Sequence, residues 1–90
     1  MTESTRVLIV DDHPLFRLGV RQLLALEPGY EVIGEAASGQ DGIALARGRG
    51  PDLILLDLNM HGRDGLETLR TMRDLGVDAL GAGGAAIAQG

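Results

Sequence analysis

Short apolar runs alternate with longer mixed segments along this chain, and their spacing predicts strands separated by helices. Strands are predicted at Arg6–Val10 and Asp52–Asp57, where the runs Val7–Val10 and Leu53–Leu56 show no polar–apolar alternation. Such strands are apolar on both faces and should be covered by helices on both sides. Glu31–Ala36 mixes apolar with charged residues and glycine, a pattern that suits a strand at the edge of the sheet.

Three helices are predicted between and after these strands. The first begins at Pro14, which suits a first helical position, and stops at Pro28-Gly29. Ser38 is placed to cap the second, with Asp41 three residues on, and Gly48–Pro51 ends it. The third runs from Gly65 to Leu75. Core-facing side chains are predicted on the first helix at Phe16, Val20, Leu23 and Leu24, and on the third at Leu66, Leu69 and Met72.

The order strand–helix, repeated three times, predicts an α/β fold with a parallel sheet and right-handed crossovers. The segment Gly76–Gly90 differs, because ten of its fifteen residues are glycine or alanine. It shows neither a β-branched run nor alternation, so we expect a disordered or loosely packed tail, with a short helix at Ala85–Gln89 as the alternative.

Three carboxylates stand where the two apolar strands end. Asp11 and Asp12 follow the first run, and Asp57 ends the third strand. Ligands of open α/β sheets bind at the carboxyl ends of the strands, so we expect the acids to converge there. Two carboxylates roughly 5 Å apart repel by about 3 kcal/mol at an effective dielectric near 20, which a hard dication such as Mg²⁺ would offset. The simpler alternative is that the acids cap the helix at Pro14.

Composition excludes several other classes of protein. Ninety residues make one small domain. The net charge of −5, with eight basic residues scattered along the chain, argues against a nucleic-acid surface. No signal peptide or membrane span is apparent, and the absence of cysteine fits a cytoplasmic protein. His13 and His61 lack partners for a transition-metal site and are expected in solvated loops, and the helical arginines, Arg17 and Arg21 among them, on solvated helix faces.

These residues together resemble the receiver domain of NarL/FixJ/LuxR-type bacterial response regulators. The resemblance covers Arg6 to about Leu75 and is carried by Val7–Pro14, Asp52–Met60 and Gly65–Glu67. It implies a three-layer, flavodoxin-like (CheY-like) α/β/α fold with strand order 2-1-3. Residues 1–5 are then a flexible N-terminus, 6–75 a partial receiver domain, and 76–90 a tail outside the family pattern.

By position, the resemblance makes Asp57 the phosphoacceptor for a histidine kinase. It implies that Asp12 binds Mg²⁺ directly, that Asp11 holds the ion partly through water, and that the backbone carbonyl of Asn59 is a further ligand. The function implied is a non-enzymatic receiver module of a two-component phosphorelay, whose intact relatives regulate transcription. A hydrolase is disfavoured, because Asn59 stands where an acid would be needed to protonate a leaving group.

The chain departs from the family pattern in three places. His61 replaces a usual proline. The family's fourth and fifth strand–helix units, which bring a Ser/Thr and a Lys to the phosphoryl group, are not matched: Gly76–Gly90 contains no Ser, Thr or Lys, and the whole chain contains no lysine. The helix-turn-helix output domain typical of the family is also not found. We therefore expect a receiver that is truncated after its third strand–helix unit. Its third strand would lie at an open edge, a site for self-association. The alternative function is a phosphorylation-incompetent fragment that acts only as an interaction module or is inert.

Overall fold

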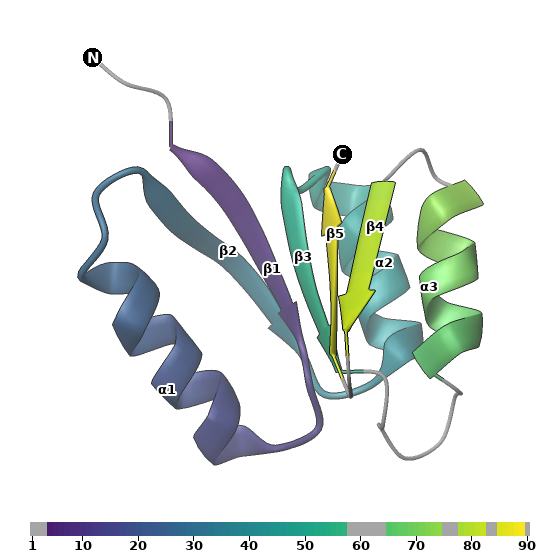
Figure 1. Cartoon of the computed structure of the whole chain (residues 1–90), viewed down its shortest axis with the longest axis horizontal. Helices are drawn as coiled ribbons and strands as arrows, with labels where there is room; N and C mark the ends of the chain where they lie inside the picture. The colour runs from purple at the N-terminus through teal and green to yellow at the C-terminus, as the bar shows by residue number, and fades with distance from the viewer. Residues whose placement is uncertain (1–3, 58–64, 75–77, 83–84, 90) are drawn as a thin grey trace.

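A five-stranded sheet in the order β2-β1-β3-β5-β4 forms the centre of the molecule. The computed structural model describes residues 4–57, 65–74, 78–82 and 85–89 (Figure 1). The strands are β1 (Thr5–Val10), β2 (Tyr30–Ala36), β3 (Leu53–Asp57), β4 (Asp78–Ala82) and β5 (Ala85–Gln89). The helices are α1 (Pro14–Ala25), α2 (Gly39–Arg49) and α3 (Gly65–Asp74). The first six elements match the predicted order, and β1 pairs in parallel with both β2 and β3.

Local signals set the helix boundaries. Pro14 occupies the first turn of α1, and Ser38 caps α2 by accepting a hydrogen bond from the backbone N–H of Asp41 at 3.2 Å. Gly50 ends α2 in the left-handed conformation, with φ of 55°, which glycine adopts at low cost. The predicted cap and stop of α2 are therefore confirmed.

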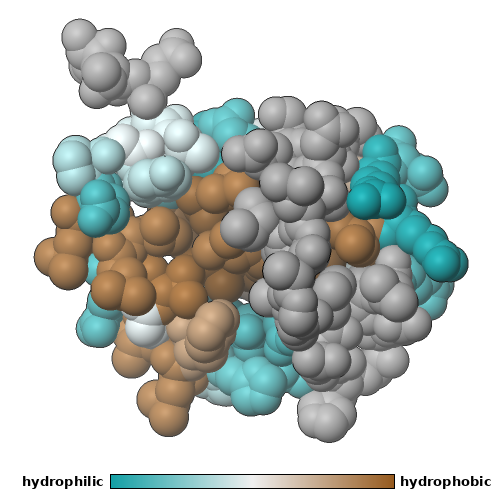
Figure 2. All heavy atoms as spheres, in the orientation of Figure 1, coloured by the Kyte–Doolittle hydropathy of each residue, from teal (hydrophilic) through white to brown (hydrophobic). Residues whose placement is uncertain are grey.

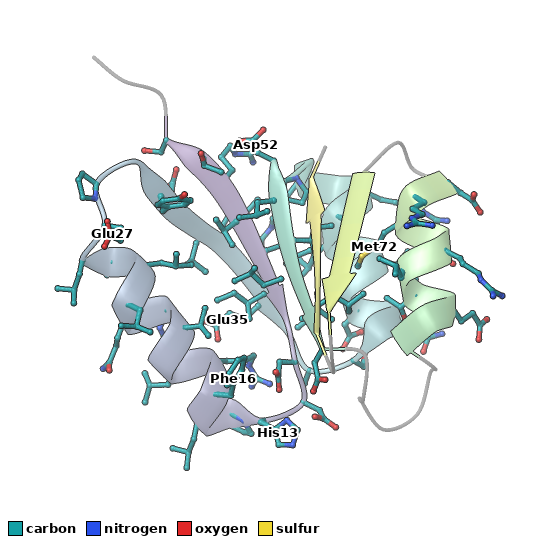
Figure 3. All side chains as sticks on the ribbon, in the orientation of Figure 1. His13, Phe16, Glu27, Glu35, Asp52 and Met72 are labelled. Atoms are coloured by element: carbon teal, nitrogen blue, oxygen red, sulfur yellow. The ribbon has the colours of Figure 1, made fainter. Side chains whose placement is uncertain are left out.

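The core lies between the sheet and the pair α2 and α3, which pack on each other on one face of the sheet (Figure 1). Its largest members are Leu8 on β1, Ile54 and Leu56 on β3, and Met72 on α3, all at most 1% exposed. Met72 is labelled in Figure 3. Each such side chain contributes about 1.5–3 kcal/mol through burial. Leu69 and Met72 confirm the predicted inner face of α3, whereas the side chain of Leu66 lies outside the described residues.

The tail corrects two of the expectations from sequence. Asp78–Ala82 and Ala85–Gln89 are strands, so for these residues the expectation of a disordered or loosely packed tail is wrong, as is the alternative of a short helix. The strand β5 pairs antiparallel with β3 on one side and β4 on the other. Strand pairing uses backbone groups, so small side chains do not prevent it. The edge of β3 is therefore occupied, and the expectation that it lies open for self-association is wrong.

The first helix also differs from expectation. It packs against β2 on the face of the sheet opposite α2 and α3 (Figure 1), but none of its twelve residues, all of them described, is buried. Val20 and Leu24 are half-buried, while Phe16 and Leu23 are exposed, so the predicted core stripe is only partly used. Among the helices of the described chain, none has both the length and the apolar character needed to cross a membrane.

Candidate functional site

The register of β1 and β3 brings the three acids together. Val10 on β1 lies beside Leu56 on β3, so Asp11, which follows β1, and Asp57, the last residue of β3, lie side by side at the ends of the two strands. One ligand atom from each of Asp11, Asp12, His13 and Asp57 falls within 4.8 Å of the others. The structure thus brings together the three carboxylates that the sequence placed at the strand ends.

The carboxylates are only slightly open to solvent. The exposed fractions of the side chains are 7% for Asp11, 15% for Asp12 and 13% for Asp57. At this burial and separation their mutual repulsion is on the order of a few kcal/mol. A cation in the cluster lowers that repulsion, so the arrangement favours binding of positive charge.

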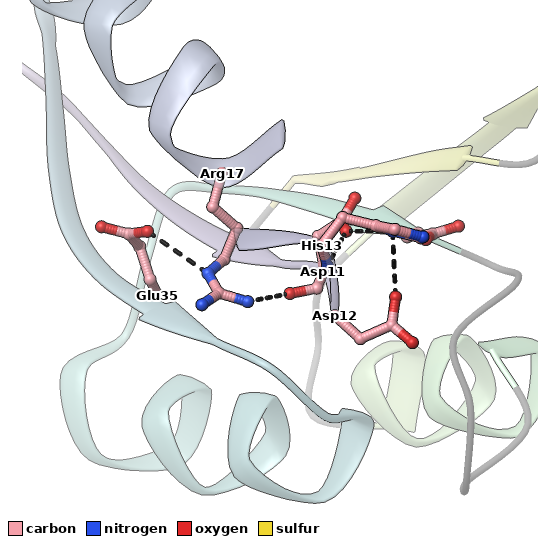
Figure 4. A network of polar contacts seen from close by, with 6 residues as sticks. Asp11, Asp12, His13, Arg17 and Glu35 are labelled. Carbon is pink, nitrogen blue, oxygen red and sulfur yellow. Dashed lines mark hydrogen bonds and ion pairs between the residues drawn. The ribbon is translucent and has the colours of Figure 1, made fainter. Parts of the chain in front are cut away.

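His13 supplies a positive partner within the chain itself. Its Nδ1 lies 2.8 Å from Asp11 Oδ1, 3.0 Å from Asp12 Oδ1 and 3.6 Å from Asp57 Oδ2 (Figure 4). The hydrogen bond with Asp11 raises the pKa of His13 above its ordinary value, and the charge of Asp12 adds to this effect. The imidazole is 64% exposed and can turn towards solvent. Sequence reasoning placed His13 in a solvated loop and missed this contact, which its position directly after two acids could have indicated.

The capping alternative for the acids is not supported. His13 is the N-cap residue of α1 and makes no side-chain capping hydrogen bond. Asp11 Oδ1 instead accepts from the backbone N–H of His13 at 2.7 Å, which orients the loop between β1 and α1. The acids therefore face one another at the end of the sheet, and neither begins the helix.

A second polar cluster holds this loop from the other side. Arg17 on α1 donates from Nη1 to the backbone carbonyl of Asp11, and its Nε lies 3.5 Å from Glu35 Oε1 at the end of β2 (Figure 4). Arg21 Nη1 donates to Glu35 Oε2 at 2.7 Å. The expectation that these arginines lie on solvated helix faces is wrong for Arg17, which is only 19% exposed. No pattern in the sequence indicated this contact, because it depends on the rotation of α1 about its axis.

The donor set fits a hard divalent cation. Three carboxylate oxygens, from buried Asp11 and half-buried Asp12 and Asp57, meet at the ends of the strands, and oxygen ligands of this kind are those that Mg²⁺ and Ca²⁺ prefer. Asn59 and His61, the remaining residues singled out from the sequence, lie outside the described residues. The described structure therefore contains an acidic cluster able to hold a metal ion.

Comparison with known proteins identifies the family. The model of the response regulator receiver domain matches residues 7–80. The chain belongs to this family. Its similarity to NarL, NarP and LuxR-type proteins confirms the resemblance read from the sequence, and the parallel strand order 2-1-3 with three helices is that of a CheY-like receiver.

Two curated relatives illustrate the similarity. The nitrate/nitrite response regulator protein NarP of Escherichia coli is 57% identical over 81 residues, which are 88% of this chain and 38% of that protein. NarL of the same species is 53% identical over 72 residues, covering 80% of this chain and 33% of NarL. The receiver thus spans about a third of the length of these relatives.

Solved structures agree with the fold. A two-component response regulator of the LuxR family from Aurantimonas sp. SI85-9A1 superposes with a TM-score of 0.76 at 38% identity, over 81% of this chain and 52% of that one. The response regulator domain of Thermotoga maritima CheB superposes with a TM-score of 0.77 at 29% identity, over 80% of this chain and 54% of that one. The chain therefore shares the fold of these response regulator structures.

Proposed function

We propose that this receiver accepts one phosphoryl group on Asp57, with Mg²⁺ held by Asp11, Asp12 and Asp57. The observation that supports the proposal is the convergence of the three carboxylates, within 4.8 Å, at the ends of two adjacent parallel strands. A sensor histidine kinase of a two-component system is the proposed donor. The backbone carbonyl of Asn59 is proposed as a further ligand from its place in the family pattern alone.

The chemistry is nucleophilic displacement at phosphorus. A carboxylate oxygen of Asp57 forms a bond to phosphorus while the bond from phosphorus to the donor nitrogen or oxygen breaks, and the leaving group departs with that electron pair and takes up a proton. Mg²⁺, when bound, neutralises charge on the carboxylate and on the phosphoryl oxygens. Asp57 is itself modified and is not regenerated in the same step, so we propose a signalling module and not a turnover enzyme.

Each residue of the site has a distinct task in this proposal. Asp11 and Asp12 supply negative charge beside the nucleophile, and the β1–α1 loop that bears them is held by the hydrogen bond from Arg17 to the Asp11 carbonyl. The side chain of His13 is 64% exposed, so it would be able to leave the cluster to a bound cation. The strand end at Leu56 fixes the backbone before Asp57, because Leu56 is 1% exposed and packed in the core.

A second candidate is a receiver fragment that cannot be phosphorylated and acts only by binding other chains. The observation that favours it is that the chain contains no lysine, the residue type that pairs with the phosphoryl group in the family pattern. Both candidates share the acidic cluster and differ in whether Asp57 reacts.

Intact-mass measurement after incubation with acetyl phosphate and Mg²⁺ separates the two. The proposal expects a gain of one phosphoryl group that is lost in Asp57→Asn and without Mg²⁺. Asp74→Asn removes one negative charge at an exposed position on α3 and should react like the parent chain. No gain in mass at any Mg²⁺ concentration would favour the second candidate. The same gain in Asp57→Asn would contradict Asp57 as the acceptor and place the phosphoryl group on another residue.

A further inference from the structure

The imidazole of His13 adds a nitrogen atom to the cluster of carboxylate oxygens. Its Nδ1 contacts Asp11, Asp12 and Asp57 at 2.8 Å, 3.0 Å and 3.6 Å. All four ligand atoms lie within 4.8 Å of one another. The cluster is therefore a mixed set of one nitrogen and three oxygens, which differs in chemistry from a set of oxygens alone.

The spacing of these atoms is that of ligands around one ion. Metal–ligand bonds of about 2.1 Å place neighbouring ligand atoms about 3.0 Å apart in an octahedral shell and about 3.4 Å apart in a tetrahedral one. The contacts of Nδ1 with the three carboxylates, at 2.8 Å to 3.6 Å, cover this range. An ion between these atoms would reach the nitrogen and the oxygens with only small movements of the side chains.

The local sequence holds the backbone of His13 in position for this role. Because Pro14 follows, the backbone of His13 is restricted to the extended region, and its φ of −101° and ψ of 104° lie there. The N–H of His13 also donates to Asp11 Oδ1 at 2.7 Å. Both constraints act before any ion binds, so less conformational entropy is lost when the ring becomes a ligand.

The site is open to solvent on the side of His13. The side chain of His13 is 64% exposed, whereas those of the three acids are 7% to 15% exposed. Figure 3 shows His13 at the start of α1, and Figure 2 shows hydrophilic side chains gathered below the ends of β1 and β3. An ion can therefore enter past His13 without disturbing the core.

An imidazole nitrogen discriminates between metal ions. Mg²⁺ is hard and prefers oxygen ligands, so it gains little from the ring. Nickel, copper and zinc bind imidazole well, and the affinity of mixed nitrogen and oxygen sites rises along the first transition series as far as copper. The exposed ring can leave the cluster to Mg²⁺, whereas a transition metal ion would retain it.

We propose that Nδ1 of His13 and the carboxylates of Asp11, Asp12 and Asp57 together bind a divalent transition metal ion, such as Ni²⁺, Cu²⁺ or Zn²⁺, more tightly than Mg²⁺. The inference rests on the proposed function in using the same three carboxylates, and it adds a ligand and a class of ion. The sequence argued against such a site because cysteine and a third histidine are absent. The structure supplies carboxylates in their place, and zinc accepts sets that combine histidine with carboxylate.

Titration calorimetry of the untagged 90-residue chain with Ni²⁺ and with Mg²⁺ tests the proposal. Protons compete for the ring nitrogen, so the titrations are run at about pH 8. The parent chain should bind Ni²⁺ at least about tenfold more tightly than Mg²⁺. His13→Asn should weaken Ni²⁺ binding by about tenfold or more and leave Mg²⁺ binding at least as strong as in the parent.

Two features make His13→Asn a clean variant. Asparagine is favoured at the N-cap of a helix, the position that His13 occupies in α1, so the helix start should be kept. His61, which lies outside the described residues, is the second of two histidines, and His61→Asn is the matched control. His61→Asn should leave the affinity for Ni²⁺ within about twofold of the parent. Far-UV circular dichroism checks that both variants keep the parent fold.

Electron spin echo spectroscopy with less than one equivalent of Cu²⁺ gives a direct measurement. The remote nitrogen of a coordinated imidazole produces a characteristic modulation, which an amine or a carboxylate does not. The modulation should appear in the parent and in His61→Asn and be absent in His13→Asn. A modulation that persists in His13→Asn, Ni²⁺ bound no more tightly than Mg²⁺, or equal losses of both ions in His13→Asn would overturn the proposal.

The same measurements separate this inference from the proposed function. A chain that binds Ni²⁺ through His13, and neither binds Mg²⁺ nor gains a phosphoryl group, would refute the proposed function and support the inference. A chain that gains a phosphoryl group with Mg²⁺, and binds Ni²⁺ equally well with and without His13, would refute the inference alone.

Discussion

Arg17 and Glu35 form an ion pair that connects α1 to the end of β2, with Nε and Oε1 3.5 Å apart. Both side chains are mostly shielded from solvent, at 19% and 24% exposed. Arg17 also donates to the carbonyl of Asp11, so one guanidinium contacts the second strand and the loop that bears the acidic pair. The position of the loop that bears the acidic pair therefore depends on a residue outside the acidic cluster.

Replacing Arg17 by methionine keeps the aliphatic stem and removes these contacts. We expect the free energy of unfolding to fall by about 1–2 kcal/mol, since a charge-assisted hydrogen bond and a shielded ion pair are lost. The apparent affinity for Mg²⁺ should fall several-fold because the β1–α1 loop is less well held. Urea denaturation followed by circular dichroism measures the first effect, and magnesium titration followed by amide NMR shifts measures the second.

Arg21→Met is the matched control for this experiment. Arg21 is 50% exposed and contacts Glu35 without reaching Asp11, so its loss should cost less than about 1 kcal/mol. Its affinity for Mg²⁺ should stay within twofold of the parent. If Arg21→Met weakened Mg²⁺ binding as strongly as Arg17→Met, the contact with Asp11 would not be what positions the loop.

The acidic cluster could be predicted from the sequence because it depends only on where strands end. Asp11 follows the apolar run of β1, and Asp57 ends β3. The parallel pairing of these two strands is itself predictable, and it places the carboxyl ends of both strands at the same edge of the sheet. His13 and Arg17 could not be placed in the same way. Their contacts depend on the path of the loop and on the rotation of α1 about its axis, which no periodicity in the sequence specifies.

The fold could be predicted where local signals are clear: the apolar run of β1 predicts a buried strand, and Ser38 and Gly48–Pro51 predict the two ends of α2. It could not be predicted for Ala85–Gln89, because the three alanines of this segment favour a helix and are depleted in strands, and the strand forms by pairing with β3. The pattern on α1 indicated an apolar stripe correctly, but burial of Phe16 requires a neighbour on that face. A pattern shows that a surface is apolar and does not show what covers it.

Gly42 on α2 provides a test of how closely the helix approaches the sheet. A Cβ at this position would lie 2.8 Å and 2.9 Å from the two methyl groups of Val10, which is fully buried. Gly42→Ala should therefore destabilise the fold by about 1–2 kcal/mol, because overpacking exceeds the gain of about 1 kcal/mol in helix propensity. Denaturant unfolding measures the change.

Gly48, in the same helix, gives the opposite expectation. A Cβ there meets nothing within 4 Å, so Gly48→Ala should raise the free energy of unfolding by about 0.5–1 kcal/mol. Stabilisation by both substitutions would mean that α2 does not pack against Val10 as closely as described. Changes of opposite sign in the free energy of unfolding would support the tight contact between Gly42 and Val10, the residue before Asp11.

Asp12→Asn tests whether the acidic cluster is kept at a cost in stability. The carboxylate is 15% exposed and close to two others, so removing its charge relieves repulsion. Without Mg²⁺ the variant should be as stable as the parent, or more stable by up to about 1 kcal/mol. Because an ion that binds only the folded state stabilises it, added Mg²⁺ should raise the melting temperature of the parent and have much less effect on the variant.

The comparison with Asp74→Asn makes this result specific to the site. That variant loses the same charge from an exposed position on α3 and should keep the full response to Mg²⁺. A thermal shift assay over a magnesium series, repeated with calcium, reports all three chains. An equal rise of melting temperature with Mg²⁺ in Asp12→Asn and the parent would exclude Asp12 as a ligand. If the variant loses this rise and is as stable as the parent or more stable without Mg²⁺, the cluster is arranged for binding and not for folding.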